Sequence, residues 1–131
     1  MIKFFSKFKI IFYCVNFILI FLYLFPGSFL GIILYDDQKI QPQITPDFVI
    51  SSNHFYVFAL VSIIGFLSFT NTKQTKNLIS YLILLSIILE IFHIIIPERS
   101  FQWIDLFGNL LGVIVVIFFN NLINKYGFFK K

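Results

Sequence analysis

Four ionisable residues stand inside or beside long apolar stretches of the chain: His54, Glu90, His93 and Asp105. A charge at the centre of a bilayer costs about 2.5–3.5 kcal/mol on insertion scales, so such residues are rare in membrane segments and usually have a partner or a task. Imidazole and carboxylate groups can transfer protons, coordinate a metal ion or hydrogen-bond a polar ligand. These four residues are therefore the first candidates for a functional site.

Their spacing places most of them on two helix faces. Glu90 and His93 are three residues apart, so they lie on one face of a helix. Asp105, Asn109 and Gly112 follow at intervals of four and three residues, which again defines a single face. A simpler interpretation remains for some of them. A histidine at a helix end can be an ordinary interfacial residue, and Asp105 can be a first-turn acid favoured by the helix dipole.

If the two faces meet beside the start of another helix, they form one polar pocket at a common depth. Small residues at Gly108 and Gly112 form a G-x-x-x-G pattern, which lets helix backbones approach closely and turns the last helix inward on nearly the side of Asn109. A loop arginine is expected above the pocket. The predicted pocket residues are His54, Glu90, His93, Arg99, Asp105 and Asn109.

The elements that must position these residues are four apolar stretches, at about residues 8–25, 49–69, 78–96 and 104–123. The chain is 59% hydrophobic and 12% charged, whereas a soluble domain averages about 45–50% apolar and about 25% charged residues. A helix of about 20 apolar residues crosses a bilayer. The sequence therefore predicts an all-α polytopic membrane protein, with four transmembrane helices in one bundle and a single domain over residues 1–131.

Proline and polar residues are expected to mark the helix ends. The second helix is predicted to begin near Ser52 or Asn53, either of which is a suitable N-cap. A polar turn is predicted over Asn71–Asn77, short enough to make the flanking helices antiparallel neighbours. Pro97 is predicted to end the third helix. Trp103 suits the belt of aromatic residues at a membrane interface.

The first apolar stretch allows two interpretations, because a basic start followed by an apolar core also suits a signal peptide. An uncleaved helix is favoured, since the run exceeds the usual signal core of about 7–15 residues and no small-x-small cleavage site follows it. The long loop Pro26–Asn53 comes next. Its apolar portion, Gly27–Tyr35, is predicted either to lie in the membrane interface or to dip back into the bundle.

The charged residues alternate between the two ends of these stretches. All six acidic residues cluster around the loops at 26–53 and 97–103. Because basic flanks stay cytoplasmic, both termini are predicted inside and the polar pocket outside. The basic residues are expected to contact anionic lipid headgroups, and nucleic acid is excluded as a partner. The eight cations predicted inside are Lys3, Lys7, Lys9, Lys73, Lys76, Lys125, Lys130 and Lys131.

The sequence contains no cofactor-binding motif of the common kinds. The chain has no P-loop and no dinucleotide fingerprint, so no cofactor is predicted. No metal site is predicted either, because the chain has neither a cysteine-based metal spacing nor an H-E-x-x-H sequence. The single cysteine, Cys14, lies in the first stretch and is expected to behave as a small apolar residue.

Two blocks of residues carry a resemblance to a known family. The first is H-F-x-x-F at His54–Phe58, at the start of a span. The second reads E-x-x-H at Glu90–His93, P-x-R at Pro97–Arg99 and D-x-x-x-N-x-x-G at Asp105–Gly112. With the break at Pro26–Ser28, this pattern resembles the VanZ-like family of small bacterial membrane proteins, over about residues 49–116.

The chain also departs from the family pattern. His93 stands where the family usually has glutamine, which keeps a polar side chain but adds a titratable one. Ile50 and Ser51 occupy the positions of an Asp-Lys pair, so the rim loses two charges, and Val116 replaces a small residue. These changes affect any ligand specificity shared with the family.

The resemblance implies a multi-pass protein of the bacterial cytoplasmic membrane that acts at the cell envelope. The family is named for a member that gives low-level resistance to teicoplanin, and its general molecular activity is not established. The expected function is non-enzymatic: an outward-facing polar pocket for a lipid headgroup, a lipid-linked glycan precursor or a partner membrane protein. The alternatives are an intramembrane enzyme acting on a lipid-linked substrate and a small transporter subunit.

Overall fold

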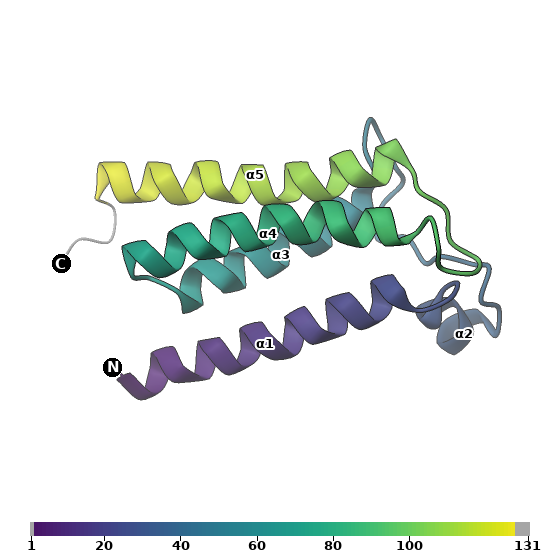
Figure 1. Ribbon diagram of the computed structural model, residues 1–131, viewed down its shortest axis with the longest axis horizontal. Helices are drawn as coiled ribbons and strands as arrows, with labels where there is room; N and C mark the ends of the chain where they lie inside the picture. The colour runs from purple at the N-terminus through teal and green to yellow at the C-terminus, as the bar shows by residue number, and fades with distance from the viewer. Residues whose placement is uncertain (1, 128–131) are drawn as a thin grey trace.

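The computed structural model describes the backbone of residues 2–127 and the side chains of residues 8–127. The prediction of a cytoplasmic location also covers Lys3, Lys7, Lys130 and Lys131, whose side chains lie outside the described residues. Within the described residues the chain forms helices and no strand, which confirms the all-α prediction. The helices are α1 (Ile2–Leu24), α2 (Phe29–Tyr35), α3 (Ser52–Ser68), α4 (Thr72–Phe92) and α5 (Trp103–Tyr126) (Figure 1).

The four long helices lie side by side, and α2 lies at one end of them (Figure 1). Helix α3 packs against both α1 and α5, and α4 packs against each of the other three long helices. Both ends of the described chain lie at the end opposite α2. The two long connections, residues 25–51 and 93–102, therefore share the α2 end with the starts of α3 and α5.

A narrow apolar core joins the long helices, and much of the remaining apolar surface faces outward. The core contains Leu19 of α1, Phe58 of α3, Leu82 of α4 and Val113 of α5. By contrast, many large apolar side chains are exposed, among them Phe17 of α1 at 71%. By length and composition α4 and α5 can each cross a membrane, and the bent pair α1 and α2 can form a third span.

The predicted polar turn at Asn71–Asn77 is wrong for most of its length, because α4 begins at Thr72. Asn71 is the N-cap, and its side chain accepts a hydrogen bond from the backbone N–H of Lys73 at 3.0 Å. The Thr75 hydroxyl donates to the Phe69 carbonyl at 2.8 Å. Side-chain capping of this kind satisfies the free N–H groups of a first turn, so polar residues start the helix and only residues 69–71 connect it to α3.

The predicted end of the third span at residue 96 is also wrong, because α4 ends at Phe92. Beyond it the backbone forms tighter bonds, from His93 N–H to the Glu90 carbonyl at 3.1 Å and from Ile94 N–H to the Ile91 carbonyl at 3.0 Å. Pro97 disfavours α conformation in the residue before it. The helix therefore unwinds early, and His93 becomes the C-cap of α4.

The other three long helices also differ from their predicted bounds. The structure gives 2–24, 52–68 and 103–126 where the sequence predicted about 8–25, 49–69 and 104–123. Ser51 rather than Ser52 or Asn53 is the N-cap of α3, and its side chain makes no capping bond. Asp47 Oδ1 instead accepts a hydrogen bond from the Ser52 backbone N–H at 2.9 Å. A carboxylate from the preceding loop thus caps this helix.

The apolar segment Gly27–Tyr35 contains a short helix across the end of the bundle. Helix α2 is bent by 85° from α1. The Ser28 hydroxyl accepts a hydrogen bond from the Gly31 N–H at 2.9 Å and starts the helix. Ile33 and Leu34 remain 62% and 60% exposed. By length and composition, the bent pair of α1 and α2 is either a broken span or a re-entrant loop.

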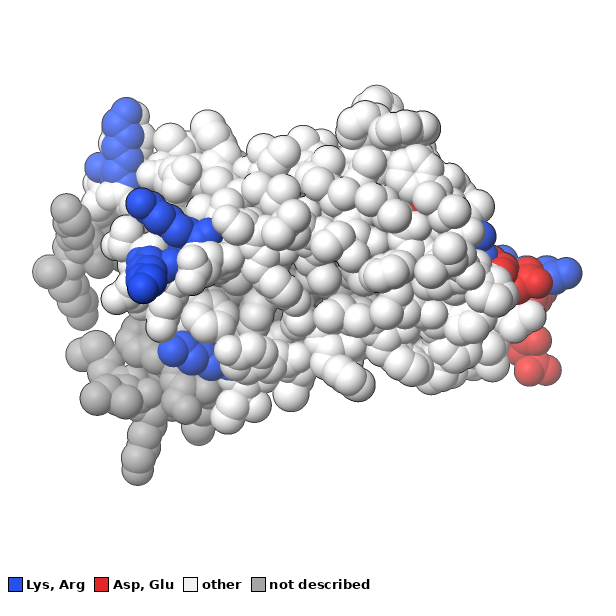
Figure 2. Space-filling model, in the orientation of Figure 1, with Lys and Arg blue, Asp and Glu red and all other residues white. Residues whose placement is uncertain are grey.

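Charged side chains occupy opposite ends of the bundle. Figure 2 shows lysine side chains at the end of the bundle opposite α2, and acidic side chains at the α2 end. The middle of this face shows almost no charge. The lysines at the first end belong to the start of α1, the start of α4 and the end of α5: Lys9, Lys73, Lys76 and Lys125.

Candidate functional site

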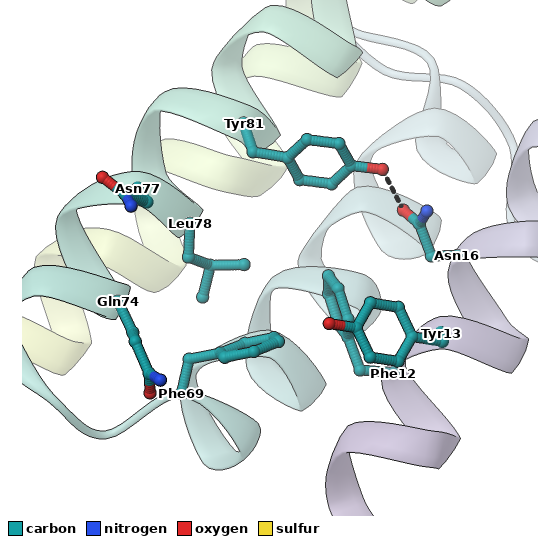
Figure 3. A pocket seen from close by; sticks show the side chains of 8 residues that line it. All are labelled: Phe12, Tyr13, Asn16, Phe69, Gln74, Asn77, Leu78 and Tyr81. Atoms are coloured by element: carbon teal, nitrogen blue, oxygen red, sulfur yellow. Dashed lines mark hydrogen bonds between the residues drawn. The ribbon is translucent and has the colours of Figure 1, made fainter.

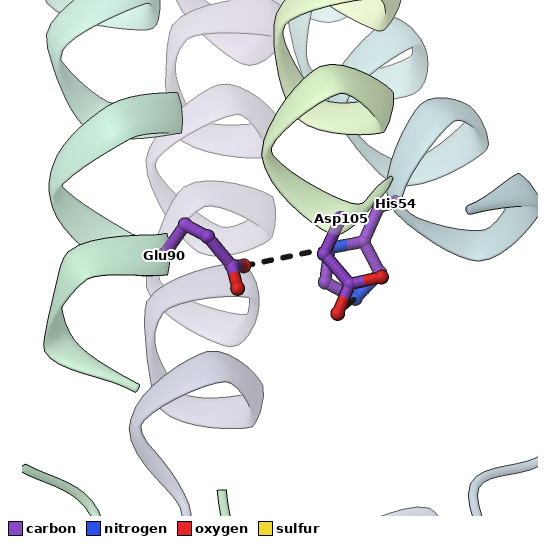
Figure 4. A group of neighbouring side chains, drawn as sticks. All are labelled: His54, Glu90 and Asp105. Atoms are coloured by element: carbon purple, nitrogen blue, oxygen red, sulfur yellow. Dashed lines mark ion pairs between the residues drawn. The ribbon is translucent and has the colours of Figure 1, made fainter. Parts of the chain in front are cut away.

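Ionisable side chains from three helices meet at the α2 end of the bundle. His54 of α3, Glu90 of α4 and Asp105 of α5 each offer one ligand atom, and these atoms lie within 4.8 Å of one another (Figure 4). The side chain of Glu90 is fully buried, and those of His54 and Asp105 are 13% and 16% exposed. The structure thus brings together three of the residues that the sequence placed in one pocket.

Asn109 lies at the centre of this cluster and is fully buried. Its amide nitrogen donates to the Ser86 carbonyl of α4 at 3.1 Å, which fixes the orientation of the amide. Its Oδ1 then accepts a hydrogen bond from the Tyr23 hydroxyl of α1 at 2.8 Å and lies 3.0 Å from His54 Nδ1. One asparagine therefore links all of the other long helices.

The Asn109 amide determines which nitrogen of His54 carries the proton. Asn109 Oδ1 is only an acceptor and receives the Tyr23 hydroxyl proton, so in this arrangement His54 Nδ1 donates to it at 3.0 Å, while the Tyr23 hydroxyl oxygen also lies 3.0 Å from Nδ1. In a neutral ring the other nitrogen, Nε2, then carries the lone pair. His54 Nε2 lies 3.7 Å from Asp105 Oδ2. The free lone pair of the imidazole thus faces the carboxylate at the mouth of the cluster.

His93 is buried behind this group. Its ring stacks on Tyr23 with centroids 5.6 Å apart, and its Nε2 donates to the Tyr23 carbonyl at 3.1 Å. Its Nδ1 lies 3.3 Å from Glu90 Oε2. Because a carbonyl can only accept, Nε2 holds one proton, and Nδ1 is left either protonated or as a lone pair directed at the carboxylate.

The Glu90 carboxylate is only half satisfied. Oε1 accepts a hydrogen bond from the Gln102 backbone N–H at 3.0 Å, whereas the buried Oε2 has no hydrogen-bond partner. A buried carboxylate oxygen without a partner is costly, since its water is removed and not replaced. The ion-pair contacts of Glu90 Oε2 are to His93 Nδ1 at 3.3 Å and to His54 Nδ1 at 3.9 Å.

Arg99 lies in the loop at the α2 end, over the cluster, and its hydrogen bonds go to α1. Its Nη2 donates to the Leu22 carbonyl at 2.9 Å and its Nε donates to the Phe25 carbonyl at 3.3 Å. No ion pair among the described side chains involves it. Partial burial lowers the pKa of its guanidinium below the usual value, although nearby acidic groups counteract this effect, and arginine stays protonated at neutral pH. Arg99 thus stabilises the negative end of α1.

Two glycines of α5 bring that helix against α3. A Cβ at Gly108 would lie 2.8 Å from the Ser51 carbonyl oxygen, and one at Gly112 would lie 2.5 Å from the Phe55 carbonyl oxygen. The absence of a side chain is therefore required for the backbones to approach this closely. This contact places Asp105 and Asn109 beside His54.

An open cavity of about 410 Å³ lies over the cluster. His54, His93 and Asp105 lie on its floor side, while loop residues from the 26–53 and 97–103 connections supply the remaining walls. The walls carry both signs of charge and several amides, including Lys39, Asp47, Asn53, Glu98, Arg99 and Gln102. The buried polar groups are thus accessible from the α2 end of the molecule.

A second pocket, of about 360 Å³, lies between α1 and α4 towards the opposite end (Figure 3). Its lining is largely aromatic, with Phe12, Tyr13 and Phe69. The Tyr81 hydroxyl donates to Asn16 Oδ1 at 2.8 Å beside it. Its lining contains no carboxylate and no imidazole, in contrast to that of the cavity over the polar cluster.

Sequence reasoning missed Tyr23, which is hydrogen-bonded to Asn109 and stacked on His93. The only signal was a hydroxyl group near the end of the first apolar stretch, and the chain has six tyrosines. Sequence reasoning also expected Cys14 to be an ordinary apolar residue, and the structure places it on the exposed surface of α1. No family model, curated protein or solved structure matches the chain.

Proposed function

We propose that this chain is a VanZ-like integral membrane protein of the bacterial cell envelope, and that it holds the polar headgroup of a lipid or lipid-linked precursor without transforming it. One observation carries the proposal: buried polar groups from four helices converge beneath an open cavity at the acidic end of the bundle. Such groups are expensive to bury in a membrane and mark functional sites.

The proposal includes four membrane crossings with both termini inside. The separation of lysines from acidic residues between the two ends supports this orientation. Helix α3 has 17 residues, or about 25 Å at 1.5 Å per residue, against a hydrocarbon core of about 30 Å. The exposed apolar residues Phe48 and Val49 precede it and extend its apolar length. The polar cavity then opens on the outer side of the cytoplasmic membrane.

The cavity walls favour a ligand with both donors and acceptors. Lys39 and Arg99 can attract a phosphate or carboxylate, while Asp47 and Asp105 can accept from hydroxyl, amide or amino groups. Two of the Arg99 donors already contact α1, so bidentate binding through Nε and Nη2 is not the expected mode. A headgroup rich in hydroxyl and amide groups suits this lining, as in a lipid-linked glycan precursor.

Native mass spectrometry of the protein released from bacterial membranes in mild detergent tests this function. The wild-type chain should carry a bound envelope lipid, and Asp105→Asn and His54→Gln should lose it. Asp36→Asn is the matched control, because Asp36 lies at the same end but outside the cavity wall. A wild-type chain that retains no more lipid than its Asp105→Asn variant would contradict the proposal.

A second candidate is an enzyme acting on a lipid-linked substrate, favoured by the unprotonated Nε2 of His54 beside Asp105. A general base needs a lone pair within reach of the proton it removes. Incubation of the purified protein with labelled lipid-linked precursors distinguishes the two functions. Product that accumulates with wild type and not with His54→Gln would favour the enzyme, and unchanged precursor would favour binding.

A further inference from the structure

We propose that His54, Glu90 and Asp105 bind a divalent transition-metal ion, for which Zn²⁺ is the best-fitting candidate. The three residues come from α3, α4 and α5, and each offers one ligand atom within 4.8 Å of the others (Figure 4). The chain has two histidines, and both lie in this cluster. The inference rests on the proposed function only in using the same pocket, because the ion needs no lipid to bind.

The separations suit a metal shell that closes slightly on binding. His54 Nε2 is 3.7 Å from Asp105 Oδ2, and the ligand atoms of the three residues all lie within 4.8 Å of one another. Zinc bonds to nitrogen and oxygen of about 2.0–2.2 Å place tetrahedral ligands roughly 3.3–3.6 Å apart. Small side-chain movements are therefore enough to bring the three groups around one ion.

A second, independent observation is the buried carboxylate oxygen directed into this group. Glu90 is fully buried, and its Oε2 accepts no hydrogen bond in the described structure, although His93 Nδ1 lies 3.3 Å and His54 Nδ1 3.9 Å from it. A buried anionic oxygen needs a positive partner to offset the loss of its water. The arginine of the neighbouring loop is bonded to α1 instead, so a cation between the three ligands would supply that partner.

Outer partners already orient two of the ligands. His54 Nδ1 donates to Asn109, which leaves Nε2 as the coordinating atom. Glu90 Oε1 is held by the Gln102 N–H at 3.0 Å. Histidine ligands of metals commonly donate their second N–H to a carbonyl or carboxylate in this way. The arrangement of the outer partners is thus that of a metal site, although the sequence spacing alone did not indicate one.

The ligand types and the cavity define the kind of ion and its coordination. Imidazole nitrogen favours zinc and later transition metals over magnesium and calcium, which prefer oxygen alone. Three protein ligands beneath an open cavity leave a fourth position for water or for a ligand oxygen. A headgroup phosphate or carboxylate in the cavity can take that position.

Metal analysis of the tag-free, full-length protein in detergent tests the site. After chelation and removal of the chelator, the wild-type protein should bind one Zn²⁺ per chain in calorimetric titration, with no competition from excess Mg²⁺. Asp105→Asn and Glu90→Gln should each weaken binding by at least the roughly 10- to 100-fold typical of losing an outer partner. Asp36→Asn, the matched control outside the cavity, should leave the affinity unchanged.

Binding of Co²⁺ is measured on the wild-type protein, so this test does not depend on whether a variant folds. A site with one imidazole and two carboxylates should give the intense visible absorption of four-coordinate cobalt, and Zn²⁺ should remove it. Zinc bound below one equivalent, or equally by Asp36→Asn and Asp105→Asn, would overturn the metal site. A protein that binds no zinc but keeps its lipid would overturn this inference alone, whereas zinc binding without lipid retention would overturn only the proposed function.

Discussion

At the scale of single residues, Asn109 does the most to organise the site. Its amide contacts the Tyr23 hydroxyl, His54 and the Ser86 carbonyl, so it orients groups on three other helices at once. Its orientation also sets the proton position on His54 and leaves Nε2 free. The cluster is therefore held by a neutral amide rather than by paired charges, and the charged groups are arranged around it.

Asn109→Leu should lower the free energy of unfolding by about 1–3 kcal/mol, because it removes the buried acceptor shared by the Tyr23 hydroxyl and His54 and the side-chain bond to the Ser86 carbonyl. Equilibrium unfolding in mixed micelles measures this difference. Asn121→Leu on the exposed surface of the same helix is the control and should change stability little. Equal destabilisation by the two substitutions would show that the buried amide has no special role.

The candidate site could be predicted in part from single residues. Ionisable residues at helical spacing indicated Glu90, His93 and Asp105, because buried charge is unusual in apolar sequence. Tyr23 could not be found in this way, since a tyrosine at the end of an apolar run is an ordinary interfacial residue. The position of Arg99 also depends on the free carbonyls of α1, which only the folded helix presents.

At the scale of the helices, the contact between α3 and α5 positions the site. The backbone of α5 at Gly112 lies so close to α3 that a Cβ would be 2.5 Å from the Phe55 carbonyl oxygen and 3.0 Å from the Ala59 nitrogen. Backbone atoms of a packed helix cannot move aside individually. Any side chain at residue 112 must therefore push α3 and α5 apart, together with the site residues on these two helices.

Gly112→Ala should consequently destabilise the protein by about 1–3 kcal/mol, the usual cost of overpacking, and should weaken ligand binding at the site. Gly65→Ala is a suitable comparison, because its Cβ would meet only side-chain atoms of Leu78 and Phe12, at 3.0–3.1 Å. These flexible groups can shift, so a smaller loss is expected. Thermal unfolding of the two variants ranks them, and a larger effect at Gly65 would contradict this explanation.

The order of the four long helices followed from the apolar stretches, whereas the short helix α2 and the helix ends did not. Polarity suggested a turn at Asn71–Asn77, but the same residues cap and begin α4 through hydrogen bonds of Asn71 and Thr75. Pro97 marked the end of α4 only approximately, because its effect on the backbone extends to the residues before it. A run of polar residues can mark either a turn or the capped start of a helix, and composition alone does not distinguish these two structures.

At the scale of the whole molecule, the two ends of the bundle differ in their charged residues and pockets. One end carries lysines and the aromatic pocket between α1 and α4, and the other carries the acidic loops, the bent α2 and the polar cluster. The large exposed apolar surface between them is suited to lipid. The orientation of the helices in a membrane thus determines whether the cavity faces the outside of the cell or the cytoplasm.

Cysteine labelling of intact cells checks the proposed orientation. In a Cys14→Ala background, Lys39→Cys should react with a membrane-impermeant maleimide, because residue 39 is exposed in the loop at the acidic end. Lys76→Cys, in the first turns of α4, should react only after the membrane is made permeable. Each variant removes one lysine, so the pair is matched in charge. The reverse pattern would place the polar cavity in the cytoplasm.

The amide of Asn109 also has a consequence for biosynthesis. Of the five helices, α5 leaves the ribosome last, and until it is inserted the partners of Asn109 on α1, α3 and α4 have no amide to bond with. A nascent chain stopped before residue 109 therefore exposes unsatisfied polar groups within the bilayer. Chains truncated before residue 109 should therefore assemble less stably than the chain that includes α5.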